Sequence, residues 1–187
     1  MSSIKLSPNS SGSGIFTVAA PNSNTDRTLT LPDNTGTFLT TGTAGVPVNG
    51  PAFSATVTTG QSVSNNTNTK INFTTEVFDS NGAYDASNSR FTPQVAGYYQ
   101  INIVVTFDNG ANGTINSAWV AKNGSPACRS WFPSVTGQYC GAQVSAVIYL
   151  NGSTDYIEAY AFQNTGSSKT TLTGTDSGFS GALVRAA

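Results

Sequence analysis

The sequence predicts an all-β protein whose larger part is a β-sandwich, and three observations support this. Ser, Thr and Asn make up roughly a third of the chain, and they favour turns and strands over helix interiors. There are 19 Gly and 8 Pro to punctuate the 187 residues. No window repeats apolar residues at helical spacing over three turns, whereas several short segments alternate apolar and polar residues.

Composition divides the chain into three parts: an N-terminal arm over residues 1–45, a hinge over 46–51 and a head over 52–187. The arm is rich in Ser, Thr, Asn and Gly. The sequence GTAGVPVNGP around the hinge combines prolines and glycines, as an extended connector does. The head holds most of the alternating segments and therefore the predicted core.

The arm contains short apolar patches at 15–20, 28–31 and 37–40, each flanked by turn residues as in PNSNTD and LPDNTG. Strands this short cannot bury a core by themselves. We therefore expect the arm to trimerise with its sister chains or to dock on another protein. The apolar side chains expected to dock are Ile15, Phe16, Val18, Leu29, Leu31, Phe38 and Leu39.

The arm sequence GIFTVAAPNSNTDRTLTLPDNTGTFLTTG resembles a segment common in tail-fibre and appendage proteins of tailed bacteriophages. In those proteins the segment often precedes a distal binding domain. The alternative interpretation is a generic β linker rich in Thr and Asn.

The head is expected to form strands at short intervals, which is typical of a sandwich. In INIVVTF, the alternation places Ile101, Ile103, Val105 and Phe107 on one face. The predicted strands are Ala52–Thr58, Thr69–Glu76, Gly97–Phe107, Ser117–Lys122, Ala142–Leu150, Asp155–Gln163 and Gly178–Val184.

The segment FTTEVFDSNGAYDASNSRFTPQVAGYYQI carries a family resemblance, through Phe73, Asp79, Tyr84, Phe91, Gly97 and Tyr99. The head resembles the globular head of complement component one-q, a trimeric jelly roll related to tumour necrosis factor. Further matching pieces follow in order, at AFSA, WVAKNG, VIYLNGSTDYIEAYAF and SGFSGALV. The resemblance implies a TNF-like jelly roll that binds or scaffolds.

The resemblance also implies a homotrimer in which an aromatic-rich face packs along the threefold axis. The residues expected at that interface are Phe73, Phe91, Tyr98, Tyr99 and Phe107. The alternative is that these rings form the core of a single subunit.

Trp131 and Phe132 are expected in the longest polar loop of the head, beside Pro133. Loops on rigid sandwiches often carry recognition, and a tryptophan there could stack on a sugar. The alternative is that the ring pins the loop to its own domain.

Asp79, Asn81 and Asp85 in DSNGAYD place oxygen ligands around a glycine turn, which suits calcium. The remaining ligands of an EF-hand loop are missing, so a turn capped by its own side chains is the favoured interpretation and no metal is assigned. Some members of the resembled family bind calcium near the trimer axis, which keeps the alternative open.

Cys128 and Cys140 could close one disulfide around the intervening loop. The alternative is two buried thiols in neighbouring strands, since a free cysteine packs as a small hydrophobic side chain. The compartment in which the chain folds would decide between them.

Composition argues against several classes of function. The chain has no histidine, the usual general base at neutral pH, and no nucleophile elbow, phosphate loop or dinucleotide fingerprint, so neither catalysis nor a cofactor is expected. Its net charge is −1 with only 9% charged residues, so a nucleic-acid partner is not expected. Its apolar runs are far short of a membrane span.

The function predicted is that of a non-enzymatic homotrimer on the surface of a tailed-phage virion, assembled in the bacterial cytoplasm. It would decorate and reinforce the shell as a cement protein, partnered by the major capsid protein, and could also touch a host surface glycan. One alternative is a tail-fibre or tailspike tip, partnered by a tail protein, that binds a bacterial polysaccharide. Another is a secreted bacterial lectin-like module.

Overall fold

The computed structural model describes residues 10–15, 17, 19, 22–26, 28 and 50–187. The chain divides into two units, Met1–Thr37 and Phe38–Ala187. The described residues of the first unit form a turn at 10–11 and contain neither strand nor helix. Nowhere in the described ranges is there a helix long and apolar enough to cross a membrane.

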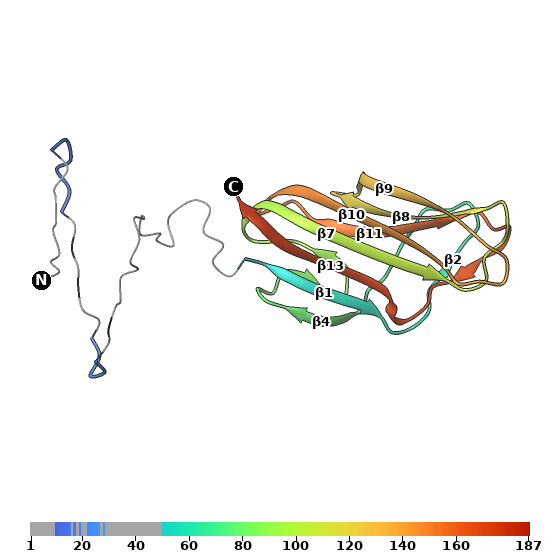
Figure 1. Cartoon of the computed structure of the whole chain (residues 1–187), viewed down its shortest axis with the longest axis horizontal. Coiled ribbons are helices and arrows are strands. Elements are labelled where there is room, and N and C mark those ends of the chain that lie inside the picture. The colour runs from blue at the N-terminus through green and yellow to red at the C-terminus, as the bar shows by residue number, and fades with distance from the viewer. Residues whose placement is uncertain (1–9, 16, 18, 20–21, 27, 29–49) are drawn as a thin grey trace, which may run out of the picture. The chain divides into compact units, whose positions relative to one another are not determined.

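The second unit is built from strands throughout its described part, which confirms the all-β prediction (Figure 1). In chain order these are β1 (Ala52–Val57), β2 (Ser62–Val63), β3 (Thr69–Lys70), β4 (Thr75–Asp79), β5 (Tyr84–Asp85), β6 (Arg90–Phe91), β7 (Ala96–Phe107), β8 (Ile115–Lys122), β9 (Ser125–Pro133), β10 (Cys140–Asn151), β11 (Ile157–Gln163), β12 (Lys169–Thr170) and β13 (Gly174–Ala186).

The strands form two antiparallel layers. One is a five-stranded sheet in the order β10-β7-β13-β1-β4. The other is a six-stranded sheet in the order β5-β6-β11-β8-β9, with β3 also paired to β11. The short strands β12 and β2 pair with each other. Neighbours in each sheet are mostly distant in sequence, as expected of a jelly-roll sandwich.

Alternation along the strands decides which side chains enter the core. β7 and β10 pair over their whole lengths, from Phe107 opposite Cys140 to Ala96 opposite Asn151. On β7 the odd-numbered positions 99 to 107 are buried, which confirms the predicted common face of INIVVTF. On β11, Ile157, Ala159 and Ala161 are likewise buried.

Aromatic rings fill the space between the sheets. The ring of Phe53 stacks on Phe91 with centroids 4.3 Å apart and on Tyr84 at 4.8 Å, and it meets Phe179 edge-on at 4.8 Å. The Tyr84 hydroxyl donates a 2.6 Å hydrogen bond to the carbonyl of Phe73, and burial raises the pKa of Tyr84. The core of one chain is therefore complete without a partner.

Two predicted features differ from the structure. The predicted strand Thr69–Glu76 is two strands, β3 and β4, which belong to different sheets and are joined through buried Ile71 and Phe73. The predicted loop after residue 124 is largely the strand β9. Pro126 and Pro133 argued against a strand in the sequence, because a proline removes a hydrogen bond between strands. A proline is tolerated at a sheet edge, and β9 is the edge strand of its sheet.

Candidate trimer interface

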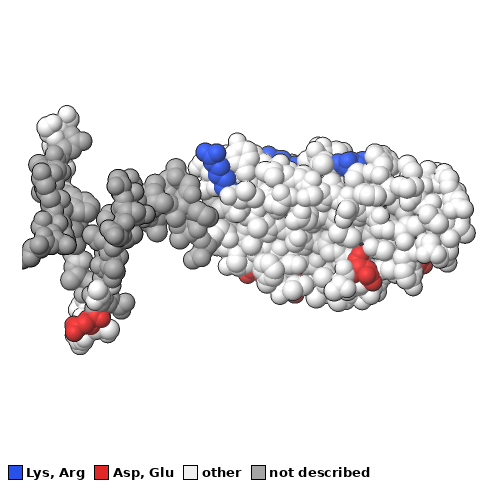
Figure 2. Space-filling view, in the orientation of Figure 1, with Lys and Arg blue, Asp and Glu red and all other residues white. Residues whose placement is uncertain are grey.

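The outer face of the five-stranded sheet lacks charge over β10, β7 and most of β13, whereas the edge strand β4 carries the exposed Glu76. β7, β10 and residues 178–184 of β13 contain no charged residue, and Arg185 follows at the end of the sheet. Figure 2 shows this face as a broad uncharged surface, with basic residues along one margin and acidic residues along the other. Charged residues are normally abundant on exposed surfaces, so their absence here indicates contact with another molecule.

Exposed apolar side chains gather on that face. Tyr98 of β7 pairs with Tyr149 of β10, and their ring centroids lie 5.5 Å apart. Both rings are nearly half exposed, and they line a depression of about 610 Å³ together with Val184 and residues 185–187. We call the following set of exposed side chains the trimer face: Tyr98, Val104, Val147, Tyr149 and Val184.

Three polar side chains of this face are already paired with one another. The Gln100 side-chain amide donates to the Ser145 hydroxyl at 2.7 Å, and that hydroxyl donates to the side-chain Oδ1 of Asn102 at 2.8 Å. A paired neutral group is much less costly to bury than a free charge. The face can therefore be covered by protein without stranding a charge.

The structure overturns most of the interface predicted from the sequence. Phe73, Phe91, Tyr99 and Phe107 are at most 1% exposed, because their side chains point between the two sheets. They form the core of one chain and cannot contact a second. Among the predicted rings, only Tyr98 lies on the trimer face.

Comparison with known proteins agrees with this architecture. Residues 52–184 match the family model of the C1q domain. The chain belongs to the C1q domain family. C1q and TNF-type domains form homotrimers and are non-catalytic binding and structural modules, so no enzymatic activity is assigned. No curated protein matches the chain.

Solved structures share the C1q fold at low sequence identity. The globular domain of zebrafish complement 1qA is 15% identical with a TM-score of 0.55, covering 73% of this chain and 99% of its own. Murine APRIL at pH 5.0 is 14% identical with a TM-score of 0.57, covering 72% and 99%. Eiger TNF from S. frugiperda is 10% identical with a TM-score of 0.53, covering 78% and 96%. These likenesses confirm the jelly-roll fold.

On the opposite sheet of the C1q head, Trp131 and Phe132 lie in β9 and not in a loop, which corrects the sequence prediction. The Arg129 guanidinium lies 3.9 Å from the centre of the Trp131 ring, and Phe162 meets that ring edge-on at 5.6 Å. Phe132 packs against the core. Both residues thus have intramolecular contacts that hold β9, and a ligand role for them stays a prediction.

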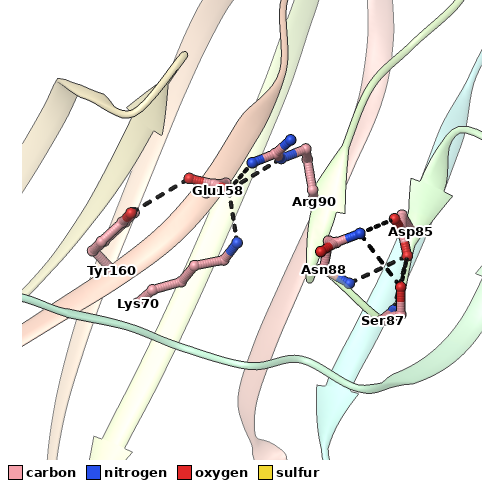
Figure 3. A network of polar contacts seen from close by, with 7 residues as sticks. All are labelled: Lys70, Asp85, Ser87, Asn88, Arg90, Glu158 and Tyr160. Carbon is pink, nitrogen blue, oxygen red and sulfur yellow. Dashed lines mark hydrogen bonds and ion pairs between the residues drawn. The ribbon is translucent and has the colours of Figure 1, made fainter.

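A buried carboxylate organises the other half of that sheet (Figure 3). Glu158 of β11 is 3% exposed, and its Oε1 accepts from Lys70 Nζ at 2.7 Å and from Arg90 Nη2 at 2.8 Å. Burial raises the pKa of Glu158, but the hydrogen bonds from both cations outweigh it and hold the pKa below its ordinary value. Because Lys70 and Arg90 belong to β3 and β6, the carboxylate ties both short strands to β11.

The proposed calcium residues cap their own turns. Asp79 accepts the amide of Asn81 at 3.2 Å and that of Tyr84 at 2.7 Å, while Gly82 supplies the required positive φ of 63°. Asp85 instead accepts from Ser87 and Asn88, which lowers its pKa to about 2 (Figure 3). Within the described ranges no three acidic, Cys or His residues cluster as a metal site would require.

The two cysteines of the C1q head are both free. Cys140 Sγ lies 3.4 Å from Ser134 Oγ, whereas Cys128 stands opposite Val120 on β8. Six residues of largely extended chain separate Cys128 from Ser134, or about 20 Å. A disulfide needs Cα atoms within about 7 Å, so of the two alternatives left open by the sequence the structure has the free thiols.

Of the apolar arm residues expected to dock, Ile15 lies among the described residues. Ile15 is 93% exposed. The other residues expected to dock lie outside the described residues: Phe16, Val18, Leu29, Leu31, Phe38 and Leu39. Their role stays a prediction.

The sequence prediction missed four members of the trimer face: Val104, Val147, Tyr149 and Val184. A usable signal was present, because the even-numbered positions of β7 and the odd-numbered positions of β10 point outward and none of them is charged. Strand alternation combined with missing charge would have identified this surface.

Proposed function

We propose that three copies of the chain assemble through the trimer face around a common axis. The observation that carries this proposal is the uncharged face of β10, β7 and β13 with its exposed Tyr98, Val147 and Tyr149. Fully burying a side chain of this size contributes about 1.5–3 kcal/mol. Three subunits that each cover several such side chains gain enough to offset the entropy lost on association.

The mass of the intact chain in solution tests the assembly. Native mass spectrometry should give three times the 19.3 kDa of one chain. Val147→Lys places a charge on the trimer face and should give monomers. Val135→Lys is the matched control, because Val135 is 50% exposed against 57% for Val147 but lies in a loop outside the face. A monomeric wild type, or a trimeric Val147→Lys, would overturn the proposal.

We further propose that the trimer decorates and reinforces the capsid of a tailed bacteriophage, attached by its N-terminal arm. The resemblance of residues 14–42 to phage appendage segments supports this. Within the head, Pro51 and the C-terminus lie at one end, since Leu183 donates to the Pro51 carbonyl and Ala187 to that of Ala96. Three arms would leave the trimer at that end, and their joint attachment raises the effective concentration.

Imaging of purified particles separates the two virion roles. Density on the icosahedral faces supports decoration, whereas density only at the tail supports the alternative, a fibre tip that binds a bacterial polysaccharide. Purified particles that lack the protein would overturn both virion roles. The proposal that the chain forms a trimer would not be affected.

A further inference from the structure

Tyr139 has no evident role in its own domain. It precedes β10 and is 73% exposed, more than any other large apolar side chain of residues 50–187. Within the described residues its ring contacts no other ring and its hydroxyl makes no hydrogen bond. An aromatic ring usually contributes to stability through burial and ring contacts, and this one has neither. The ring is therefore available to another molecule.

The loops around Tyr139 are held rigidly. Gly110 donates to the Gln138 carbonyl at 2.9 Å, and Asn112 and Thr136 exchange two hydrogen bonds of 3.0 and 3.1 Å. A Cβ atom at Gly110 would lie 2.4 Å from atoms of Cys140 and Ser134, so the two loops are closely packed. A site on a preorganised support loses little entropy when a ligand binds.

Beside the ring lies a pocket of about 440 Å³, lined by Asp108, Asn109, Gly137, Gln138 and Tyr139. The Asp108 Oδ1 accepts the amide of Thr170 at 2.9 Å, which fixes the carboxylate. Its Oδ2, and the side-chain amides of Asn109 and Gln138, have no partner among the described residues. The pocket thus offers one anchored carboxylate and two unpaired side-chain amides next to an exposed aromatic ring.

The pocket lies at the far end of the head from Pro51 and the C-terminus. Residue 96 at the start of β7 accepts a hydrogen bond from Ala187, and β7 then runs 12 residues to Phe107, directly before Asp108. At 3.3 Å per residue this places the pocket about 35–40 Å from the C-terminus. A head attached through its N-terminal side would present the pocket outward.

We infer that this pocket binds a neutral saccharide unit, with the Tyr139 ring against the apolar face of a pyranose. The carboxylate of Asp108 and the amides of Asn109 and Gln138 match the adjacent hydroxyl groups of a sugar, which donate and accept in pairs. The carboxylate disfavours phosphate or other anions, because no cation lines the pocket to compensate its charge. The site is complete within one chain and extends the proposed structural role.

Saturation-transfer NMR of the full chain tests the inference, with methyl glycosides of glucose, galactose, mannose, rhamnose and N-acetylglucosamine as probes. At least one should receive saturation. Tyr139→Ala should weaken its binding about tenfold or more, and Tyr139→Phe, which keeps the ring, about threefold or less. Trp131→Ala should leave binding unchanged, since that ring lies on the other sheet.

Three results would overturn the inference: no transfer to any of the five sugars, undiminished binding by Tyr139→Ala, or loss of binding in Trp131→Ala. A fourth such result would be a change in the number of subunits of Tyr139→Ala, measured by native mass spectrometry. The ring would then be a contact between subunits. A monomeric wild type that binds sugar through Tyr139 would support the inference while refuting the proposed trimer, so the two failures are distinguishable.

Discussion

The two outer faces of the sandwich both carry aromatic side chains but use them differently. On the six-stranded sheet each ring has a partner: Trp119 stacks on Tyr160 at 4.4 Å, Trp131 on Arg129, and Tyr156 lies under Arg90 at 3.8 Å. We call this surface the paired face. On the trimer face, Tyr98 and Tyr149 contact each other, Lys122 Nζ lies a more distant 5.7 Å from the Tyr149 ring, and the valines around them remain exposed.

This difference indicates which surface needs another molecule. On the paired face, cations and rings satisfy one another within one chain, so water can cover what remains. On the trimer face, apolar area is exposed and the neighbouring charges, Arg185 and Lys122, lie at its Tyr98–Tyr149 end, which leaves the rest of the face uncharged and favours association. The faces differ in how far their rings are satisfied by contacts within the chain.

The largest expected effect comes from placing a negative charge on each face in turn. Tyr149→Glu should abolish the trimer, because association through this face would bury the new carboxylate and remove its hydration. Tyr156→Glu on the paired face should keep the trimeric mass, although it removes the contact with Arg90. Analytical ultracentrifugation at micromolar concentration measures both. Equal masses for the two variants would remove the distinction between the faces.

The second expected effect is specific to the paired face. Glu158→Gln leaves Lys70 and Arg90 beside a neutral amide and should lower the free energy of unfolding by about 2–3 kcal/mol. Urea unfolding is best measured in the monomeric Tyr149→Glu background, where stability does not depend on concentration.

The matched control is Glu76→Gln, because Glu76 is exposed on edge strand β4 and forms no ion pair with any described residue. It should change stability by less than about 0.5 kcal/mol. If both substitutions cost the same, the Glu158 network does not stabilise the sheet.

Acidification should remove the stabilising effect of Glu158. Its pKa in the folded chain lies below the ordinary value of 4.5, because the hydrogen bonds from Lys70 and Arg90 outweigh the effect of burial. The contribution is therefore fully present above about pH 4.5 and is lost as the pH falls through the folded pKa. The stability difference between Glu158 and Glu158→Gln should be constant from about pH 7 to 5 and shrink below 4.5. A difference that grows on acidification would contradict the assignment.

The contrast between the faces also explains what the sequence could predict. Alternation correctly identified the inward side of β7, since Ile101 to Phe107 form a clear period of two. It could not tell whether Phe73 and Phe91 face a core or a neighbouring subunit, because both environments select the same residue types. Only the pairing of strands distant in sequence places these rings between two sheets.

The position of Trp131 illustrates a second limit. The strand β9 was not predicted, because it contains Pro126, Pro133 and several polar residues. The sequence before it nevertheless contains a hairpin signal. Asn123 and Gly124 adopt φ values of 53° and 77°, as in a two-residue turn that leads directly into another strand. That turn chemistry predicts a strand after residue 124. The stacking of Arg129 on Trp131, in contrast, depends on side-chain geometry that no local pattern specifies.

The smallest expected effect tests whether contacts or exposure decide what an aromatic side chain contributes. Trp131 and Tyr139 are both exposed, at 50% and 73%, but only Trp131 has partners, in Arg129 and Phe162. Trp131→Ala should lower the free energy of unfolding by about 1–2 kcal/mol, since it removes a cation–π and an edge-to-face contact. Tyr139→Ala should change it by less than about 0.5 kcal/mol. Urea unfolding of the two variants in the same monomeric background gives the comparison. A large cost for Tyr139→Ala would mean that its ring supports the loop, and a negligible cost for Trp131→Ala would mean that the paired face is held by its backbone alone.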